Sequence, residues 1–112
     1  MDDPSNLLTF STNNCRGLRN DNTRRDYFNW LKSKPVLIHF LQETHCHLRK
    51  EKAKWGREWS SNVKDSFWSL GTNRSKGVAI LFHPRLRELG IDIVVSDVLL
   101  DSNGRYIKLI IK

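Results

Sequence analysis

Two polar residues, Asn14 and Glu43, each stand at the end of an apolar segment and carry oxygen atoms that suit a hard cation. Glu43 comes just after the apolar run from Pro35 to Leu41, and Asn14 follows the partly alternating segment 6–13. In an α/β sheet, ligands and metals collect at the carboxyl ends of the strands. Mg²⁺ binds carboxylate and other oxygen atoms there. The pair therefore suggests metal-assisted chemistry on a phosphodiester.

Two strands and one helix must position these residues. Segment 6–13 alternates in polarity, and residues 36–41 are nearly all apolar, as expected for a strand covered on both faces. Between them, Asn20 or Asp21 can cap a helix that runs to Lys32. Its apolar stripe is expected at Tyr27, Phe28, Trp30 and Leu31. Strand, helix and strand in this order predict a right-handed crossover between parallel strands.

The rest of the chain is predicted to add one helix and four strands. The helix spans residues 48–60, with Leu48, Trp55 and Trp59 as its buried edge. The strands are expected within residues 64–70, 78–82, 91–100 and 105–112. Turn-forming residues at 71–77 and 101–104 separate them. The fold class is therefore α/β, with a first third of alternating strand and helix and a last third made of strands.

The composition is typical of one globular domain over residues 1–112, with 38% hydrophobic and 28% charged residues. No apolar run approaches the roughly 18 residues of a membrane span, so no membrane partner is expected. The two cysteines, Cys15 and Cys46, are expected to be reduced thiols of an intracellular protein. Cys46 lies between two histidines, but a structural zinc site needs four ligands in paired spacing, which this sequence lacks.

The net charge of +7 favours a polyanionic partner, because neutralised phosphates release counterions. Charge alone does not separate nucleic acid from acidic lipid. The candidate phosphate contacts are Arg16, Arg74 and Lys76. Simpler interpretations stay open. Glu43 is alternatively an acid that caps a turn or pairs with an arginine. Asn14 is alternatively a turn residue whose side chain bonds the local backbone, and the loop cations are alternatively solvated side chains.

Four segments, in order, carry a resemblance to a known family. They are Asn14-Cys15-Arg16-Gly17-Leu18, Phe28-Asn29-Trp30-Leu31, Leu41-Gln42-Glu43-Thr44-His45, and residues 71–82 with the later Gly104-Arg105-Tyr106. Together they resemble the N-terminal half of the endonuclease/exonuclease/phosphatase superfamily. The most similar subgroup is the apurinic-type endonuclease domain of non-LTR (LINE-type) retrotransposons.

The resemblance implies a partial two-sheet α/β sandwich of the deoxyribonuclease-like type, acting on DNA in the nucleus. It implies a Mg²⁺-dependent phosphodiesterase, with Mn²⁺ as a substitute ion. Glu43 would hold the metal, and Asn14 beside it would orient the scissile phosphate or a neighbouring acid. The residues of the Arg-Gly-Leu and Gln-Glu-Thr-His segments disfavour a phosphatase-type member of the superfamily.

The chain departs from that family because it lacks the later Tyr, Asp-x-Asn and Asp-His elements. Those elements supply the water-activating base and the remaining metal and phosphate contacts. We therefore expect residues 1–112 to be the N-terminal part of such a domain, inactive alone unless a C-terminal half or a second chain completes it. The alternative is a non-catalytic remnant that binds nucleic acid or docks a partner.

Overall fold

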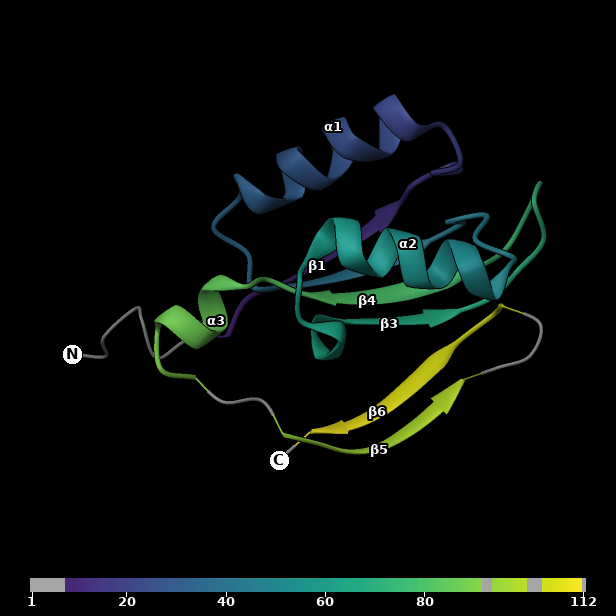
Figure 1. The fold of residues 1–112 in the computed structure, drawn as a ribbon. Helices are drawn as coiled ribbons and strands as arrows, with labels where there is room; N and C mark the ends of the chain where they lie inside the picture. The colour runs from purple at the N-terminus through teal and green to yellow at the C-terminus, as the bar shows by residue number, and fades with distance from the viewer. Residues whose placement is uncertain (1–7, 92–93, 101–103, 112) are drawn as a thin grey trace.

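The computed structural model describes residues 8–91, 94–100 and 104–111 (Figure 1). Four strands form one mixed sheet in the order β1-β2-β4-β3. Their bounds are β1 Phe10–Asn14, β2 Ile38–Gln42, β3 Ser66–Ser69 and β4 Val78–Phe82. Strands β1 and β2 are parallel, as predicted, while β4 runs antiparallel to both of its neighbours. The carboxyl ends of β1 and β2 therefore meet at one edge of the sheet.

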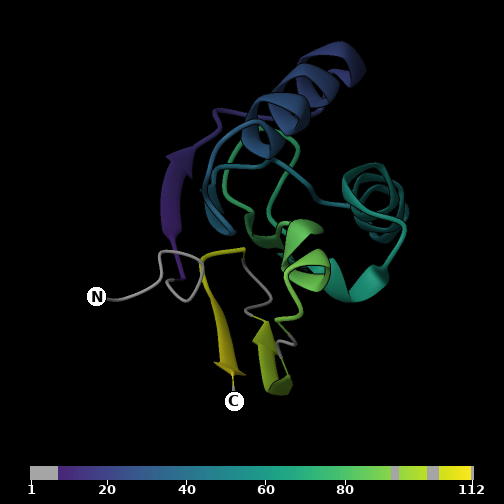
Figure 2. The same ribbon diagram turned by 90° about the vertical axis from the view of Figure 1, so that its left-hand side faces the viewer.

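Two helices, α1 (Asp21–Lys32) and α2 (Arg49–Trp59), cover one face of this sheet (Figures 1 and 2). The predicted cap of α1 is confirmed, since Asn20 Oδ1 accepts a hydrogen bond of 3.0 Å from the Thr23 amide. The apolar core between the helices and the sheet includes Phe28, Leu31, Leu41, Trp55, Trp59, Trp68 and Leu81. Burying this layer holds α1, and hence the loop before it, in place on the sheet.

A second, two-stranded sheet lies on the other face (Figures 1 and 2). It consists of the antiparallel strands β5 (Val95–Leu100) and β6 (Ile107–Ile111). Ile107 packs with a second apolar cluster that includes Leu37, Ile38, Ile80, Phe82 and Leu86. The described chain is thus a mixed α/β domain with a helical layer, a four-stranded sheet and a small second sheet.

Several local predictions were wrong for identifiable reasons. Leu48 is exposed because it is the N-cap of α2 and has extended rather than helical backbone. Trp30 is 47% exposed because the buried face of α1 consists of Arg24, Phe28 and Leu31, at i, i+4 and i+7. The Lys34 ammonium lies 4.8 Å from the centre of the exposed Trp30 ring.

The strand boundaries also differ from the prediction. The first strand begins at Phe10 and extends to Asn14, while positions 6–7 lie outside the described residues. Two short helical turns, η2 (Val63–Asp65) and α3 (Arg85–Glu88), were not predicted. Strand β5 begins at Val95 rather than 91, and the predicted turn at 101–103 is outside the described part of the chain.

Candidate functional site

The structure brings the two key residues to neighbouring strand ends. Asn14, the last residue of β1, lies opposite Gln42, the last residue of β2, and Glu43 follows directly. The backbone pairing continues past both strands, because the Cys15 amide donates to Gln42 O at 2.9 Å. The Gly17 amide likewise donates to Glu43 O at 2.8 Å. The loop after β1 is therefore held directly against Glu43.

A third loop, between β3 and β4, closes over the same edge. The Thr44 amide donates to Gly77 O and the His45 amide to Lys76 O, both at 3.0 Å. The Gly77 amide in turn donates to Gly104 O at 2.9 Å. We call residues 14–18, 42–46 and 71–77 the strand-end cluster. Its three loops are fixed to one another by backbone hydrogen bonds, so its side chains are presented from a rigid frame.

Unusual backbone conformations collect in the strand-end cluster. Among the described residues, four that are not glycine have positive φ, and all four lie in this cluster: Arg16 (54°), Glu43 (54°), His45 (62°) and Lys76 (63°). An L-residue in this region costs roughly 1–2 kcal/mol. Such strain persists where the surrounding structure fixes the conformation, and it is common at active and binding sites. This concentration marks the edge as the candidate functional site.

Gly17 is required by the tight packing of this cluster. Its φ is 97°, a region that residues with a Cβ rarely adopt. A Cβ added there would lie 2.6 Å from the Nδ1 atom of His45. The glycine thus allows the His45 ring to lie against the loop after β1.

The Glu43 side chain is partly buried, and it has no hydrogen bond or ion pair with any residue that the structure describes. Among the other described carboxylates, the exposed Asp26 and Glu88 are also unpaired, whereas the partly buried Glu51 pairs with Arg19 at 2.6 Å. Asn14 is exposed, and its Oδ1 accepts from the Arg16 amide at 3.2 Å. That local bond fits the turn interpretation of Asn14, while its Nδ2 donor has no partner among the described residues.

The neighbouring cysteine offers no nucleophile. Burial raises the pKa of the Cys15 thiol to about 11, partly opposed by its hydrogen bond to Tyr27, and the Glu43 carboxylate raises it further. Cys46 is fully buried, and burial raises its pKa to about 12. Both are free cysteines. At neutral pH both remain neutral thiols, so thiolate chemistry does not fit this site.

The three predicted phosphate contacts all lie in the strand-end cluster. Arg16, Arg74 and Lys76 are exposed, and no carboxylate of the described residues forms an ion pair with them. In the described part of the chain, no group of three or more His, Cys, Asp or Glu side chains is placed to hold a metal ion. Glu43 would therefore need oxygen atoms from Asn14, Gln42, water or a substrate phosphate to complete a Mg²⁺ shell. Mg²⁺ accepts such a mixed shell.

Two buried polar residues were not predicted. The Arg24 side chain is fully buried and bonds Asp21 Oδ1 at 2.7 Å, Glu58 Oε1 at 3.0 Å and Leu18 O at 2.9 Å, which ties both helices to the strand-end cluster. His39 Nδ1 lies 2.7 Å from the Ser11 hydroxyl oxygen. Sequence offers little warning of the burial of Arg24, since a polar residue in an amphipathic helix normally faces water. His39 lies within the segment 36–41 that was expected to be covered on both faces.

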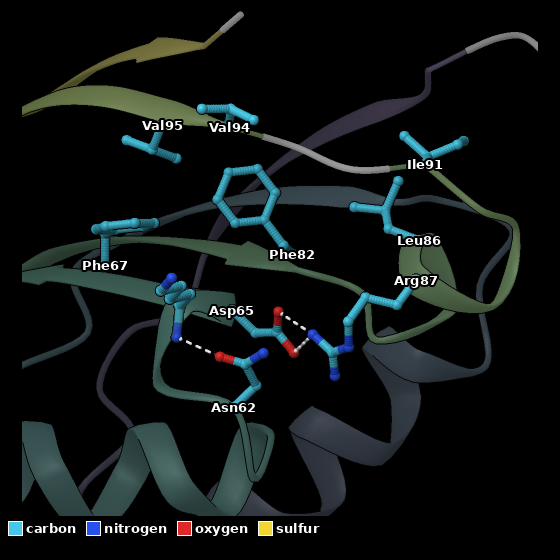
Figure 3. Close-up of a pocket in the computed structure, with 10 residues that line it drawn as sticks. Asn62, Asp65, Phe67, Phe82, Leu86, Arg87, Ile91, Val94 and Val95 are labelled. Carbon is cyan, nitrogen blue, oxygen red and sulfur yellow. Dashed lines mark hydrogen bonds and ion pairs between the residues drawn. The ribbon is translucent and has the colours of Figure 1, made fainter.

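A defined cavity of about 490 Å³ lies at the other end of the sheet and is lined by Phe82, whose partner in the sheet is the first residue of β2 (Figure 3). Its walls are mostly apolar, and its Asp65 carboxylate is already bound by Arg87 at 2.6 Å. It contains none of the predicted site residues. The strand-end cluster, with unpaired polar groups and strained backbone, is therefore the better candidate for chemistry.

A scan against protein-family models and a search of curated proteins found no match for this chain. Within the described residues, no helix has the length and apolar character that crossing a membrane requires.

Proposed function

We propose that the strand-end cluster carries two of the catalytic groups of a Mg²⁺-dependent DNA endonuclease of the retrotransposon type. One observation supports this most directly. Glu43 is a partly buried carboxylate that lies directly after β2, beside Asn14 at the end of the parallel strand β1, and is left unpaired by the described residues. A carboxylate that only stabilised the fold would be expected to have an arginine or a backbone amide as partner. The motif resemblance described above favours the same assignment.

Each residue has a distinct role in this proposal. Bound Mg²⁺, or Mn²⁺ in its place, would polarise a phosphoryl oxygen and stabilise the charge that develops on it. Glu43 supplies the anionic oxygen that holds the ion. Asn14 has a carboxamide that can donate to a phosphate oxygen without adding charge. Arg16, Arg74 and Lys76 would contact neighbouring phosphates.

The arrangement of the sheets is consistent with a deoxyribonuclease-like sandwich, because an apolar layer that contains Phe82 and Ile107 lies between the two sheets. The resemblance assigns the water-activating base to later segments that have no counterpart in these 112 residues. We therefore propose that a further segment or a second chain supplies the base, and that the DNA is cleaved only then, in the nucleus. The 112-residue chain alone should bind metal and DNA but not nick a plasmid.

Isothermal calorimetry with Mg²⁺ tests the proposal on the 112-residue chain. Glu43→Gln should weaken binding about tenfold or more, a loss of about 1.4 kcal/mol or more. The control is Glu88→Gln, which removes an equal charge from an exposed acid at the end of α3. Equal Mg²⁺ affinity in the Glu43→Gln variant and the unmodified chain would contradict the proposal.

A second candidate function is metal-independent binding of nucleic acid in the nucleus. The same non-catalytic domain would alternatively dock a partner. Nucleic-acid binding is favoured by the exposed, unpaired Arg16, Arg74 and Lys76 and by the lack of a three-residue metal group among the described residues. In this case oligonucleotide affinity would fall steeply with salt and would not change with Mg²⁺. Glu43→Gln would then leave DNA binding intact or strengthen it, because it removes a negative charge.

A further inference from the structure

A hollow lies beside the strand-end cluster, between the first turns of α2 and the end of β3. Its volume is about 670 Å³, and its lining includes Arg49, Lys52, Ala53, Trp68 and Leu70. Leu70 directly precedes Gly71, whose amide donates to Cys46 O at 2.8 Å. Leu100 at the end of β5 also lines the hollow and is 37% exposed. The hollow therefore lies next to the candidate site and is open to solvent.

The part of the lining that the structure describes is positively charged. Among the described residues it contains Arg49 and Lys52 but no carboxylate. The one acid in the first turn of α2, Glu51, is bound by Arg19 at 2.6 Å and by the His47 and Leu48 amides. The N-terminus of an α-helix adds a partial positive charge on the same side. An anionic group is the ligand that such a surface attracts.

The inner wall of the hollow is apolar and includes the ring of Trp68. Trp68 is 1% exposed, and its indole Nε1 has no hydrogen-bond partner in the described structure. By contrast, the indole of Trp59 donates to Phe82 O at 2.9 Å. The Trp68 nitrogen has almost no accessible surface and lies near Gly56, which does not line the hollow, so a ligand in the hollow meets the ring of Trp68 and not its N–H.

We infer that this hollow binds one nucleotide unit, with the phosphate held by Arg49 and Lys52 and the base against Leu70 and the Trp68 ring. A nucleotide combines the two required properties, since it has an anion and a flat, weakly polar body. The inference rests on the proposed function, because it extends the path of a nucleic-acid strand beyond the strand-end cluster. A free nucleotide carries the same groups as a nucleotide within a strand, so the experiment tests both a mononucleotide and an oligonucleotide.

The test measures the affinity of a fluorescein-labelled eight-residue oligothymidylate by anisotropy, in EDTA, from low to moderate salt. The variant is Arg49→Gln/Lys52→Gln. The control is Lys50→Gln/Arg57→Gln, which removes two exposed cations of the same helix that do not line the hollow. The slope of log K against log salt concentration changes by about 0.7 for each phosphate contact on a single strand. Loss of two contacts should therefore reduce the slope by about 1.4. The control slope should change by less than half of that.

A second readout is the indole N–H resonance of Trp68, assigned by its absence in Trp68→Phe. It should shift when thymidine 5′-monophosphate or the oligomer is added, and the Arg49→Gln/Lys52→Gln variant should lose the shift. A response to the mononucleotide at similar concentration identifies a free-nucleotide site, and a response to the oligomer alone identifies a strand site. Equal slopes in the two double variants, or an unmoved resonance with both ligands, would overturn the inference. Because EDTA removes Mg²⁺, these results are independent of metal binding at Glu43.

Discussion

Gly17→Ala should destabilise the fold more than replacement of a glycine that borders open space, because two separate penalties apply at this position. An alanine at φ 97° pays the cost of the left-handed region, roughly 1–2 kcal/mol. Its Cβ would also lie 2.6 Å from His45 Nδ1, and overpacking of this kind costs roughly 1–3 kcal/mol. The expected loss in free energy of unfolding is therefore about 2–5 kcal/mol.

Gly90 provides a matched control for this prediction. It has a φ of 74°, but an added Cβ there would meet nothing within 4 Å. Gly90→Ala should therefore cost only the conformational part, about 1–2 kcal/mol. The double variant Gly17→Ala/His45→Ala removes the ring and should recover most of the difference between the two single variants. Urea unfolding at pH 7 measures all three.

Equal losses for Gly17→Ala and Gly90→Ala would refute the reasoning. That result would mean that the His45 ring moves aside at no cost, and that the strand-end cluster is not a rigid frame. A loss that persists in the double variant would also count against the ring contact as its cause.

Further predictions concern the buried polar residues. Burial lowers the pKa of His39 to about 4, below the ordinary 6.5, so the folded state holds it neutral while the unfolded chain takes up a proton. The contribution of neutral His39 to the free energy of unfolding should therefore be fully present above pH 6.5 and should fall by at most about 3 kcal/mol towards pH 4. His39→Gln should flatten this pH dependence in urea unfolding. Arg24→Ala should lower the free energy of unfolding by about 3–5 kcal/mol, because it leaves the Leu18 carbonyl and nearby acids without their buried partner. Thermal unfolding measures this loss, and a loss of less than about 1 kcal/mol would contradict the prediction. The chain should show no plasmid nicking in Mg²⁺, and nicking that Glu43→Ala abolishes would reverse this view.

Much of the fold could be predicted from the sequence because local signals and tertiary structure agree. The apolar run that ends at Leu41 is a buried strand, and Asn20 caps the preceding helix as its side chain allows. Asn14 and Glu43 could be placed at one sheet edge because a strand-helix-strand order favours parallel pairing. These inferences need only neighbouring residues and one topological rule.

Other features could not be predicted because they depend on residues far apart in the chain. The positive φ of Glu43 and His45 follows from hydrogen bonds to loops 14–18 and 71–77, and no residue near them indicates it. Trp30 looks apolar in sequence but lies on the outer side of α1. Arg24 looks like a surface cation, and its burial depends in part on Glu58, which approaches from α2.

The most direct test of the metal site is paramagnetic line broadening by Mn²⁺ in a two-dimensional amide spectrum of the chain. Our account predicts that substoichiometric Mn²⁺ broadens the amides of residues 14–17 and 42–45 first, and that Glu43→Gln abolishes this effect. The amides around Glu88 should stay sharp. Broadening centred on Asp21 or Glu58 would contradict a shared site for Asn14 and Glu43. So would a spectrum in which these amides broaden only at Mn²⁺ concentrations that affect all exposed acids equally.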